Sequence, residues 1–162
     1  MNEIKWDLDK LSTGDRSVLK RCAGEMLRDQ VKAIEVFYRG LIVFPKKSES
    51  QWFACMCMDC LWNSTSQSVK PFEEMLRDLY NNKNTSPSMR KRIVALLDIP
   101  WSEDGYLLGK LAGFAHMFRS ANNAAKPDFN KLADDLSSWN HPDRFVQRKW
   151  IRVICRESDE NN

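Results

Sequence analysis

The residues that most readily suggest chemistry in this chain are three cysteines in one apolar segment. Cys57 and Cys60 form a C-x-x-C pair, and Cys55 lies two residues before it. Such a pair can contribute to a zinc site or carry out thiol–disulfide exchange. A structural zinc site needs four ligands, but the sequence has no second C-x-x-C and only two distant histidines, His116 and His141. We therefore predict buried, reduced thiols and no bound metal, because cysteine in an apolar stripe behaves as a small hydrophobic residue.

Other catalytic motifs are missing from the sequence. No serine lies in a nucleophile elbow, and no glycine-rich loop could cradle a phosphate. Adjacent acidic residues such as Glu73 and Glu74 point about 100° apart on a helix and are typical of a solvated surface. We predict that His116 is a core or boundary residue and that His141 has a role in a turn. The sequence therefore predicts neither an enzyme nor a bound cofactor.

Three glycines, Gly105, Gly109 and Gly113, recur every fourth residue and so share one face of a predicted helix. In a membrane-spanning helix this spacing is typical of a dimer interface. Lys110 interrupts the apolar stretch, however, and no segment of the chain reaches the length of a membrane span. We therefore predict that the glycines allow close packing of this helix against another helix of the fold.

The basic residues of the predicted last helix are the most informative. At about 100° per residue, its cations fall within one arc of about 100°, and Phe145 lies inside that arc. The apolar residues fall on the opposite side. The cations are Arg148, Lys149, Arg152 and Arg156, and the apolar residues are Val146, Trp150, Val153 and Ile154. The helix is thus predicted to have an apolar inner face and a basic outer face.

Two further groups of basic residues occur earlier in the chain. Lys20, Arg21 and Arg28 are predicted on the outer side of the first helix, and Arg90-Lys91-Arg92 flanks the apolar face of a later one. Exposed lysine and arginine side chains can neutralise phosphates without reading base sequence. A solvated helix face is the alternative for any single group. Three groups without an enzyme motif favour a helical domain that binds nucleic acid.

Helical periodicity runs through nearly the whole sequence, with no strand-like alternation and no hairpin turn. We predict an all-α fold, a bundle of about seven to nine helices that can divide into two lobes. Expected helices start at Ser12–Asp15 and at Ser86-Pro87, where serine caps the helix. The others are expected at Val31–Val43, Gln51–Asn63, Pro71–Tyr80, Glu103–Ser120, from Pro127 or Asp128 to Trp139, and from Asn140–Asp143 to Arg156.

The length of 162 residues suits one domain, and 43% hydrophobic residues suffice for a core. We predict a single domain over 1–157, with lobes 1–82 and 86–157 hinged at Asn81–Thr85, and a frayed acidic tail over 158–162. A net charge of +3 is only mildly basic and does not by itself indicate nucleic-acid binding. Because no signal peptide or membrane span is evident, we expect a cytoplasmic protein with reduced cysteines.

Several segments resemble one known family, in the same order along nearly the whole chain. Gly14-Asp15-Arg16-Ser17-Val18-Leu19-Lys20-Arg21 is similar to a Gly-Asp-Arg, two residues, Leu-Arg-Arg signature, and Ser88–Leu97 resembles an arginine-rich segment ending in Leu-Leu. Asp135-Leu136-Ser137-Ser138-Trp139 and Arg148-Lys149-Trp150 resemble a C-terminal Asp-Leu-x-x-Trp and basic-Trp pattern. The family is CasB, the small subunit of the type I-E CRISPR surveillance complex, Cascade. Lys20 replaces a usual arginine, which keeps the charge but loses the bidentate fork.

The resemblance implies a non-catalytic, all-helical subunit that stabilises the R-loop. It implies sequence-independent binding of the displaced DNA strand and of the guide–target duplex. The implied partners are the Cascade backbone and large subunits, a second copy of the chain, guide RNA and target DNA, with no membrane. We expect the nucleic-acid-binding residues to be Arg16, Lys20, Arg21, Arg90, Arg92, Arg148, Lys149 and Arg152. The alternatives are a helical protein–protein adaptor whose basic faces only keep it in solution and, more remotely, a redox or zinc protein.

Overall fold

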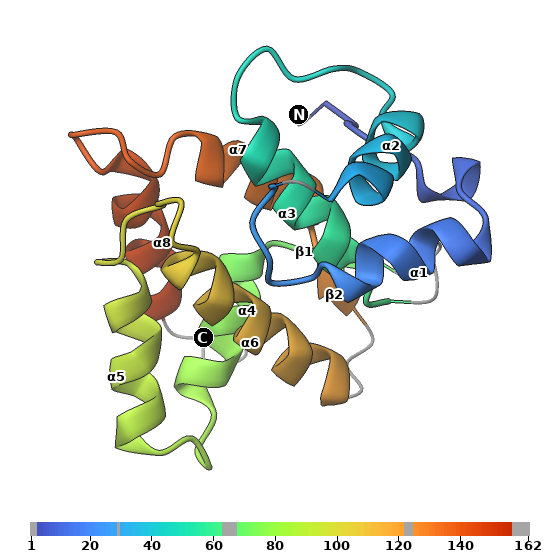
Figure 1. Cartoon of the computed structure of the whole chain (residues 1–162). Coiled ribbons are helices and arrows are strands. Elements are labelled where there is room, and N and C mark those ends of the chain that lie inside the picture. Colours follow the sequence, from blue (N-terminus) through green and yellow to red (C-terminus); the bar gives the residue numbers. More distant parts are fainter. Residues whose placement is uncertain (1–2, 29, 63–67, 122–124, 157–162) are drawn as a thin grey trace.

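The computed structural model describes residues 3–28, 30–62, 68–121 and 125–156 (Figure 1). Within these ranges the chain forms eight α-helices, a short 3-10 helix and two three-residue strands. The elements are η1 (Leu8–Lys10), α1 (Thr13–Arg21), α2 (Val31–Gly40), α3 (Glu49–Asp59), β1 (Ser68–Lys70), α4 (Phe72–Asn81), α5 (Pro87–Leu96), α6 (Tyr106–Ser120), β2 (Ala125–Pro127), α7 (Phe129–Ser137) and α8 (Phe145–Cys155). The mostly helical bundle predicted from the sequence is confirmed.

Local capping explains why several helices start where they do. The Ser12 hydroxyl accepts a hydrogen bond from the backbone N–H of Asp15 at 3.0 Å, and the Ser86 hydroxyl accepts one from Met89 at 3.1 Å. Pro87 occupies the first position of α5, where its missing N–H has no cost to the helix. Both predicted helix starts are confirmed.

Two predicted helices end earlier than expected, and glycine takes part in both cases. α1 ends at Arg21, and Gly24 then adopts φ +91°, so Arg28 does not continue the outer face of α1 as predicted. α2 ends at Gly40, whose carbonyl accepts a hydrogen bond from Asp7 at 2.9 Å. The chain after Gly40 is instead extended and pairs with the N-terminal segment through an antiparallel bridge between Trp6 and Leu41.

The two short strands are a feature that the sequence did not predict. β1 and β2 pair in parallel, with Ser68 opposite Ala125 and Lys70 opposite Pro127. Three residues are too few to show a period of two, and the partners lie far apart in the sequence.

The core is built around α3, which lies at the centre of the molecule (Figure 1). Every residue from Phe53 to Cys60 is buried, and α1, α6 and α7 pack against the helix. Phe53 meets Phe37 of α2 edge to face at 5.5 Å between ring centres. A helix that is apolar all round is enclosed by other elements in this way.

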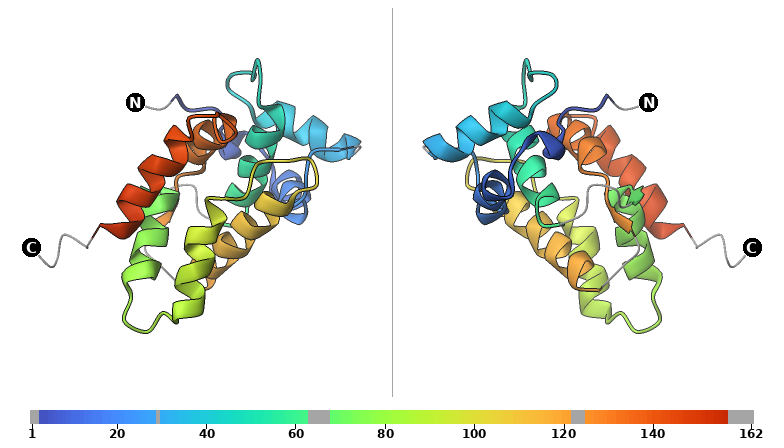
Figure 2. Two further views of the ribbon diagram at one scale, coloured as in Figure 1. Left: turned by 90° about the vertical axis from the view of Figure 1, so that its left-hand side faces the viewer. Right: turned by 90° about the vertical axis from the view of Figure 1, so that its right-hand side faces the viewer.

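The orientation of α8 is fixed by two tryptophans and a small polar network. Trp139 and Trp150 pack edge to face at 5.1 Å, and α8 lies beside α4 in both views of Figure 2. The Trp150 indole donates to Asp135 at 2.9 Å, and the Lys131 ammonium binds both Asp135 at 2.8 Å and Glu73 at 2.6 Å. Burial alone would lower the pKa of Lys131, but these hydrogen bonds raise it above its ordinary value. The network joins α4, α7 and α8.

The predicted lobes 1–82 and 86–157 are in extensive contact, since α3 packs on α7 and α4 packs on α8. In the predicted hinge, the Thr85 hydroxyl donates to the Leu79 carbonyl at 2.6 Å, and Asn84 donates to the Asn82 side chain at 2.8 Å. A division into lobes with a hinge here stays a prediction. The predicted acidic tail, 158–162, lies outside the described residues.

Candidate nucleic-acid interface

The strongest candidate interface is the outer face of α8, whose two-sided character is confirmed. Arg148, Lys149 and Arg152 are exposed, whereas Trp150 and Ile154 are buried. Arg156, just beyond the helix, is exposed as well, and Phe145 is 43% exposed beside this face. We call Arg148, Lys149 and Arg152 the α8 basic face.

The α8 basic face retains most of its donors for an external ligand. Lys149 and Arg152 form no hydrogen bond or ion pair with any described residue. One guanidinium nitrogen of Arg148 donates a hydrogen bond to the Asp143 carbonyl at 2.6 Å. Because phosphate oxygens accept hydrogen bonds from exposed ammonium and guanidinium groups, this face can bind a polyanionic strand.

Arg144, at the start of α8, has a structural role that the sequence did not reveal. It lies in the left-handed region with φ 53°, and its guanidinium donates to the Leu97 carbonyl and to Asp98 at 3.2 Å. These bonds connect the start of α8 to the end of α5. Left-handed backbone at a non-glycine residue is costly, and here these contacts hold it in place.

The basic group of α5 divides into residues with different environments. Arg90 is half-buried, and its guanidinium donates to the carbonyls of Tyr80 at 2.8 Å and Asn82 at 3.0 Å. Arg90 therefore holds the turn between α4 and α5, and its role in nucleic-acid binding stays a prediction. Lys91 and Arg92 are exposed and have no ion pair with a described residue.

The basic group of α1 is smaller than predicted. Lys20 and Arg21 are exposed at the end of the helix, and Arg16 is half-buried near Cys60. Arg28, placed with them by the sequence pattern, lies in the following loop and donates to the Glu103 carbonyl at 3.2 Å. The helix stops before Arg28, so its position was predicted wrongly.

The eight predicted site residues do not form one cluster. α1 lies at the end of the molecule away from α8 in Figures 1 and 2. By contrast, α5 and α8 line a common hollow of about 440 Å³, with Val94 on one side and Arg148 and Ile151 on the other. The structure thus separates the α1 group, Arg16, Lys20 and Arg21, from the α5 and α8 cations.

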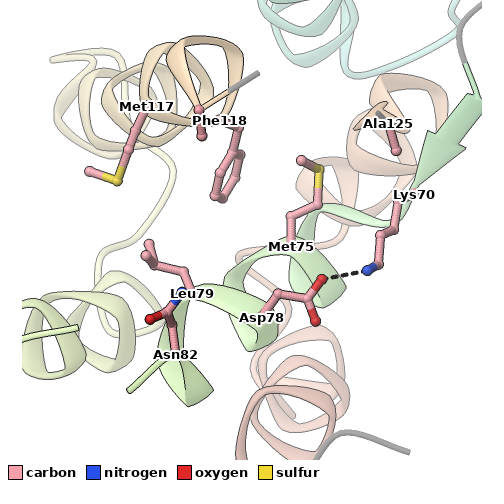
Figure 3. Close-up of a pocket in the computed structure, with 9 residues that line it drawn as sticks. Lys70, Met75, Asp78, Leu79, Asn82, Met117, Phe118 and Ala125 are labelled. Atoms are coloured by element: carbon pink, nitrogen blue, oxygen red, sulfur yellow. Dashed lines mark hydrogen bonds and ion pairs between the residues drawn. The ribbon is translucent and has the colours of Figure 1, made fainter. Parts of the chain in front are cut away.

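The hollow between α4 and α6 does not resemble a catalytic site in its lining. Figure 3 shows this hollow of about 360 Å³, lined by Met75, Leu79 and Phe118, with an ion pair between Lys70 and Asp78 at one side. This lining is largely apolar, and its two charged groups neutralise each other. Among the described residues, no three histidine, cysteine or acidic side chains are grouped to hold a metal ion.

The cysteine segment is buried, as predicted. Cys55, Cys57 and Cys60 all lie within the core, and burial raises the pKa of the first two thiols well above the ordinary value. Burial, together with the neighbouring Asp59 carboxylate, raises the pKa of Cys60 to about 12. A thiol that resists ionisation is a poor nucleophile and a poor metal ligand, which argues against the redox and zinc alternatives.

Two features predicted for α6 are not found. His116 is exposed, so its assignment to the core or its boundary is wrong. Gly105 precedes α6 with φ +75°, and an ideal Cβ at Gly109 or Gly113 would meet no described heavy atom within 4 Å. The predicted packing of another helix of this fold on these glycines is therefore wrong.

The turn role of His141 is confirmed, because its Nδ1 accepts from the Asp143 N–H at 3.1 Å.

Two residues beside Gly109 and Gly113 could bind a ligand, and the sequence analysis did not predict this. Tyr106 and Lys110 are exposed and one helical turn apart on α6, and the Lys110 ammonium lies 5.2 Å from the Tyr106 ring centre. The sequence pattern indicated only that Lys110 interrupts an apolar stretch. The signal that was available is their spacing of four residues, which places an aromatic ring and a cation on one face.

None of the helices in the described residues is both long enough and apolar enough to cross a membrane.

Comparisons with known proteins point to one family. The family model described as CRISPR-associated protein Cse2 matches residues 15–153. Among solved structures, a chain of a CRISPR RNA-guided surveillance complex is similar with a TM-score of 0.67 and 17% identity, covering 88% of this chain and 82% of that chain. CasB from M. ruber is similar with a TM-score of 0.63 and 19% identity, covering 91% of this chain and 87% of that one. These structural similarities show a shared fold. No curated protein matches the sequence.

Proposed function

This chain belongs to the Cse2 family of CRISPR-associated proteins, and from this premise we propose that it is a non-catalytic small subunit of a type I-E CRISPR surveillance complex, Cascade. Its role is to stabilise the R-loop by binding the displaced DNA strand and the guide–target duplex without reading their sequence. Its partners are the backbone and large subunits, a second copy of itself, guide RNA and target DNA.

The observation that carries this proposal is the α8 basic face. Arg148, Lys149 and Arg152 project from a helix whose opposite side is buried, so three cations are held along one rigid surface. Contacts to phosphates fix a strand in place but carry no sequence information. Exchange of a DNA duplex for a guide–target duplex is nearly balanced in energy, so a few such contacts can favour the open R-loop.

The second group of cations, on α1, supports two separate contacts rather than one groove. Lys20 and Arg21 are exposed in the last turn of α1, a helix that lies across the molecule from α8 in Figure 1. One subunit can therefore touch nucleic acid at two places. Contacts made within an assembled complex gain from high effective concentration, so each can be weak by itself.

A helical adaptor that binds only protein is the second candidate, because apolar side chains are exposed around α2. Val31 is 76% exposed and Phe44 is 67% exposed, and Ile42 lies between them in sequence. Exposed apolar side chains can take part in a protein–protein contact. A complex subunit would need such a contact too, so these side chains alone do not decide between the two candidates.

Nuclease protection of the displaced strand separates the candidates. Complexes are reconstituted with the wild-type chain, without it, or with Arg148→Ala/Lys149→Ala/Arg152→Ala, and are then bound to target DNA and treated with a single-strand-specific nuclease. We expect protection with the wild-type chain and strong cleavage in the other two cases. If the variant assembles normally and protects the strand as well as the wild type does, the adaptor function is favoured.

A further inference from the structure

A groove lies between α5 and α6, and the proposed function assigns it no role. Its volume is about 380 Å³, which lies within the range of about 300–1,000 Å³ typical of small-ligand sites. Its apolar lining comes from both helices, and its rim is polar. The apolar residues are Ala95, Leu96, Ile99, Phe114 and Met117, and the rim residues are Arg92, Tyr106 and Lys110.

The rim of the groove is positively charged. Arg92 on α5 and Lys110 on α6 are both exposed, and neither forms an ion pair with a described residue. No aspartate or glutamate is among the residues that line the groove. An anionic ligand would therefore find cations on both walls and no opposing carboxylate.

An aromatic ring stands at the same rim. Tyr106 is 57% exposed, and the Lys110 ammonium lies 5.2 Å from its ring centre. A tyrosine ring this exposed is accessible to a flat ligand that could stack on it. Nucleobases of every type stack on such rings, and sequence-independent single-strand binding uses this combination of rings and cations.

A ligand in the groove could come close to the backbone of α6. Gly109 and Gly113 lie on the α6 side of the groove, and an ideal Cβ at either position would meet no described heavy atom within 4 Å. Glycine inside a helix lowers helix stability relative to alanine, and no packing among the described residues requires it here. The missing side chains leave the helix backbone within reach of a flat ligand.

We propose that this groove binds one nucleotide of a single strand, with its base stacked on Tyr106 over the Gly109–Gly113 surface. Arg92 and Lys110 then pair with the phosphates on either side of that nucleotide. The inference rests on the proposed function, because it takes the single strand as the partner of this subunit. It adds a base-stacking site to the phosphate contacts of α8.

The site is tested by photo-cross-linking in the assembled complex. The displaced strand of the target carries 5-iododeoxyuridine at successive positions, and cross-linked peptides are identified by mass spectrometry. We expect a cross-link to Tyr106 in the wild-type chain. Tyr106→Ala should weaken target binding by about five-fold to 150-fold, the range for loss of one stacked base, whereas Tyr106→Phe should retain it.

A second variant excludes a folding defect as the cause. Gly109→Ala/Gly113→Ala covers this backbone with methyl groups while raising helix propensity, so it should keep or raise the melting temperature but lose the Tyr106 cross-link. If this double variant folds but prevents assembly of the complex, a partner protein occupies the groove, and the inference is wrong.

The outcomes distinguish this inference from the proposed function. If Tyr106→Ala binds as the wild type does while loss of the α8 basic face weakens binding, the groove inference fails and the proposed function stands. If both sets of variants bind as the wild type does in a normally assembled complex, both fail.

Discussion

Replacing Arg148, Lys149 and Arg152 with alanine removes three exposed cations from one helix face and leaves its buried side intact. Trp150 and Ile154 still pack inward, and substitutions on an exposed surface usually change stability by less than about 0.5 kcal/mol. The variant should therefore fold and assemble. It has as many basic as acidic residues, because it loses three of the 25 basic side chains against 22 acidic ones.

The expected loss follows from counterion release. Each phosphate contact to a single strand contributes about 0.7 to the slope of log affinity against log salt, so three contacts contribute about 2. Between about 50 and 200 mM salt, the wild-type complex should lose about 20-fold more affinity for target DNA than the variant complex does, for each copy of the subunit that contacts the strand. Titration of labelled target DNA with each reconstituted complex at four salt concentrations measures both slopes.

A matched control removes the same charge elsewhere. Lys10→Ala/Lys46→Ala/Lys47→Ala deletes three exposed cations too, one in η1 and two in the segment between α2 and α3. Its salt slope should equal that of the wild type. Equal slopes for all three complexes would refute the reasoning, because the α8 cations would then release no counterions on binding.

Three further predictions concern the fold. In the native protein, a thiol reagent at pH 8 should modify Cys155 quickly and the other cysteines slowly, because only Cys155 is exposed; rapid reaction of more than one thiol would contradict this. The folded-state pKa of Lys131 lies above its ordinary 10.5, so its contribution to stability is complete below that value and is lost as the pH rises through the folded pKa. Lys131→Met should therefore reduce the fall in melting temperature at alkaline pH, and an unchanged pH profile would show that Lys131 is not responsible. Asp59→Ala should cost about 3–5 kcal/mol in urea unfolding, because it leaves buried Lys126 without its partner at 2.6 Å, whereas Asp59→Leu/Lys126→Met should recover part of it and still leave the buried Trp6 indole N–H without its acceptor.

Local signals in the sequence were enough to place most helices. Ser12 and Ser86 cap helices through their own hydroxyls, so the information lies within three residues of each start. The end of α2 at Gly40 depends instead on pairing with the N-terminal segment, and β1 depends on β2 far along the chain. Such contacts exist only in the folded chain, and periodicity cannot reveal them.

The candidate site was predictable in its charges but not in their partners. Helical spacing was sufficient to place Arg148 and Arg152 on one outer face of α8. It could not show that Arg90 binds two backbone carbonyls, since those carbonyls become available only where α4 ends. It also could not show that Gly113 and His116 remain uncovered, because periodicity defines a helix face without saying what packs on it.

The central claim is that this subunit stabilises the R-loop through contacts that do not read sequence. The most direct test is the lifetime of the R-loop on two target DNAs of unrelated sequence, measured by single-molecule fluorescence with complexes that contain or lack the chain. We expect a longer lifetime with the chain, by a similar factor on both targets, and a loss of that gain with the Arg148, Lys149 and Arg152 alanine variant. Equal lifetimes with and without the chain, in complexes that are otherwise fully assembled, would contradict it.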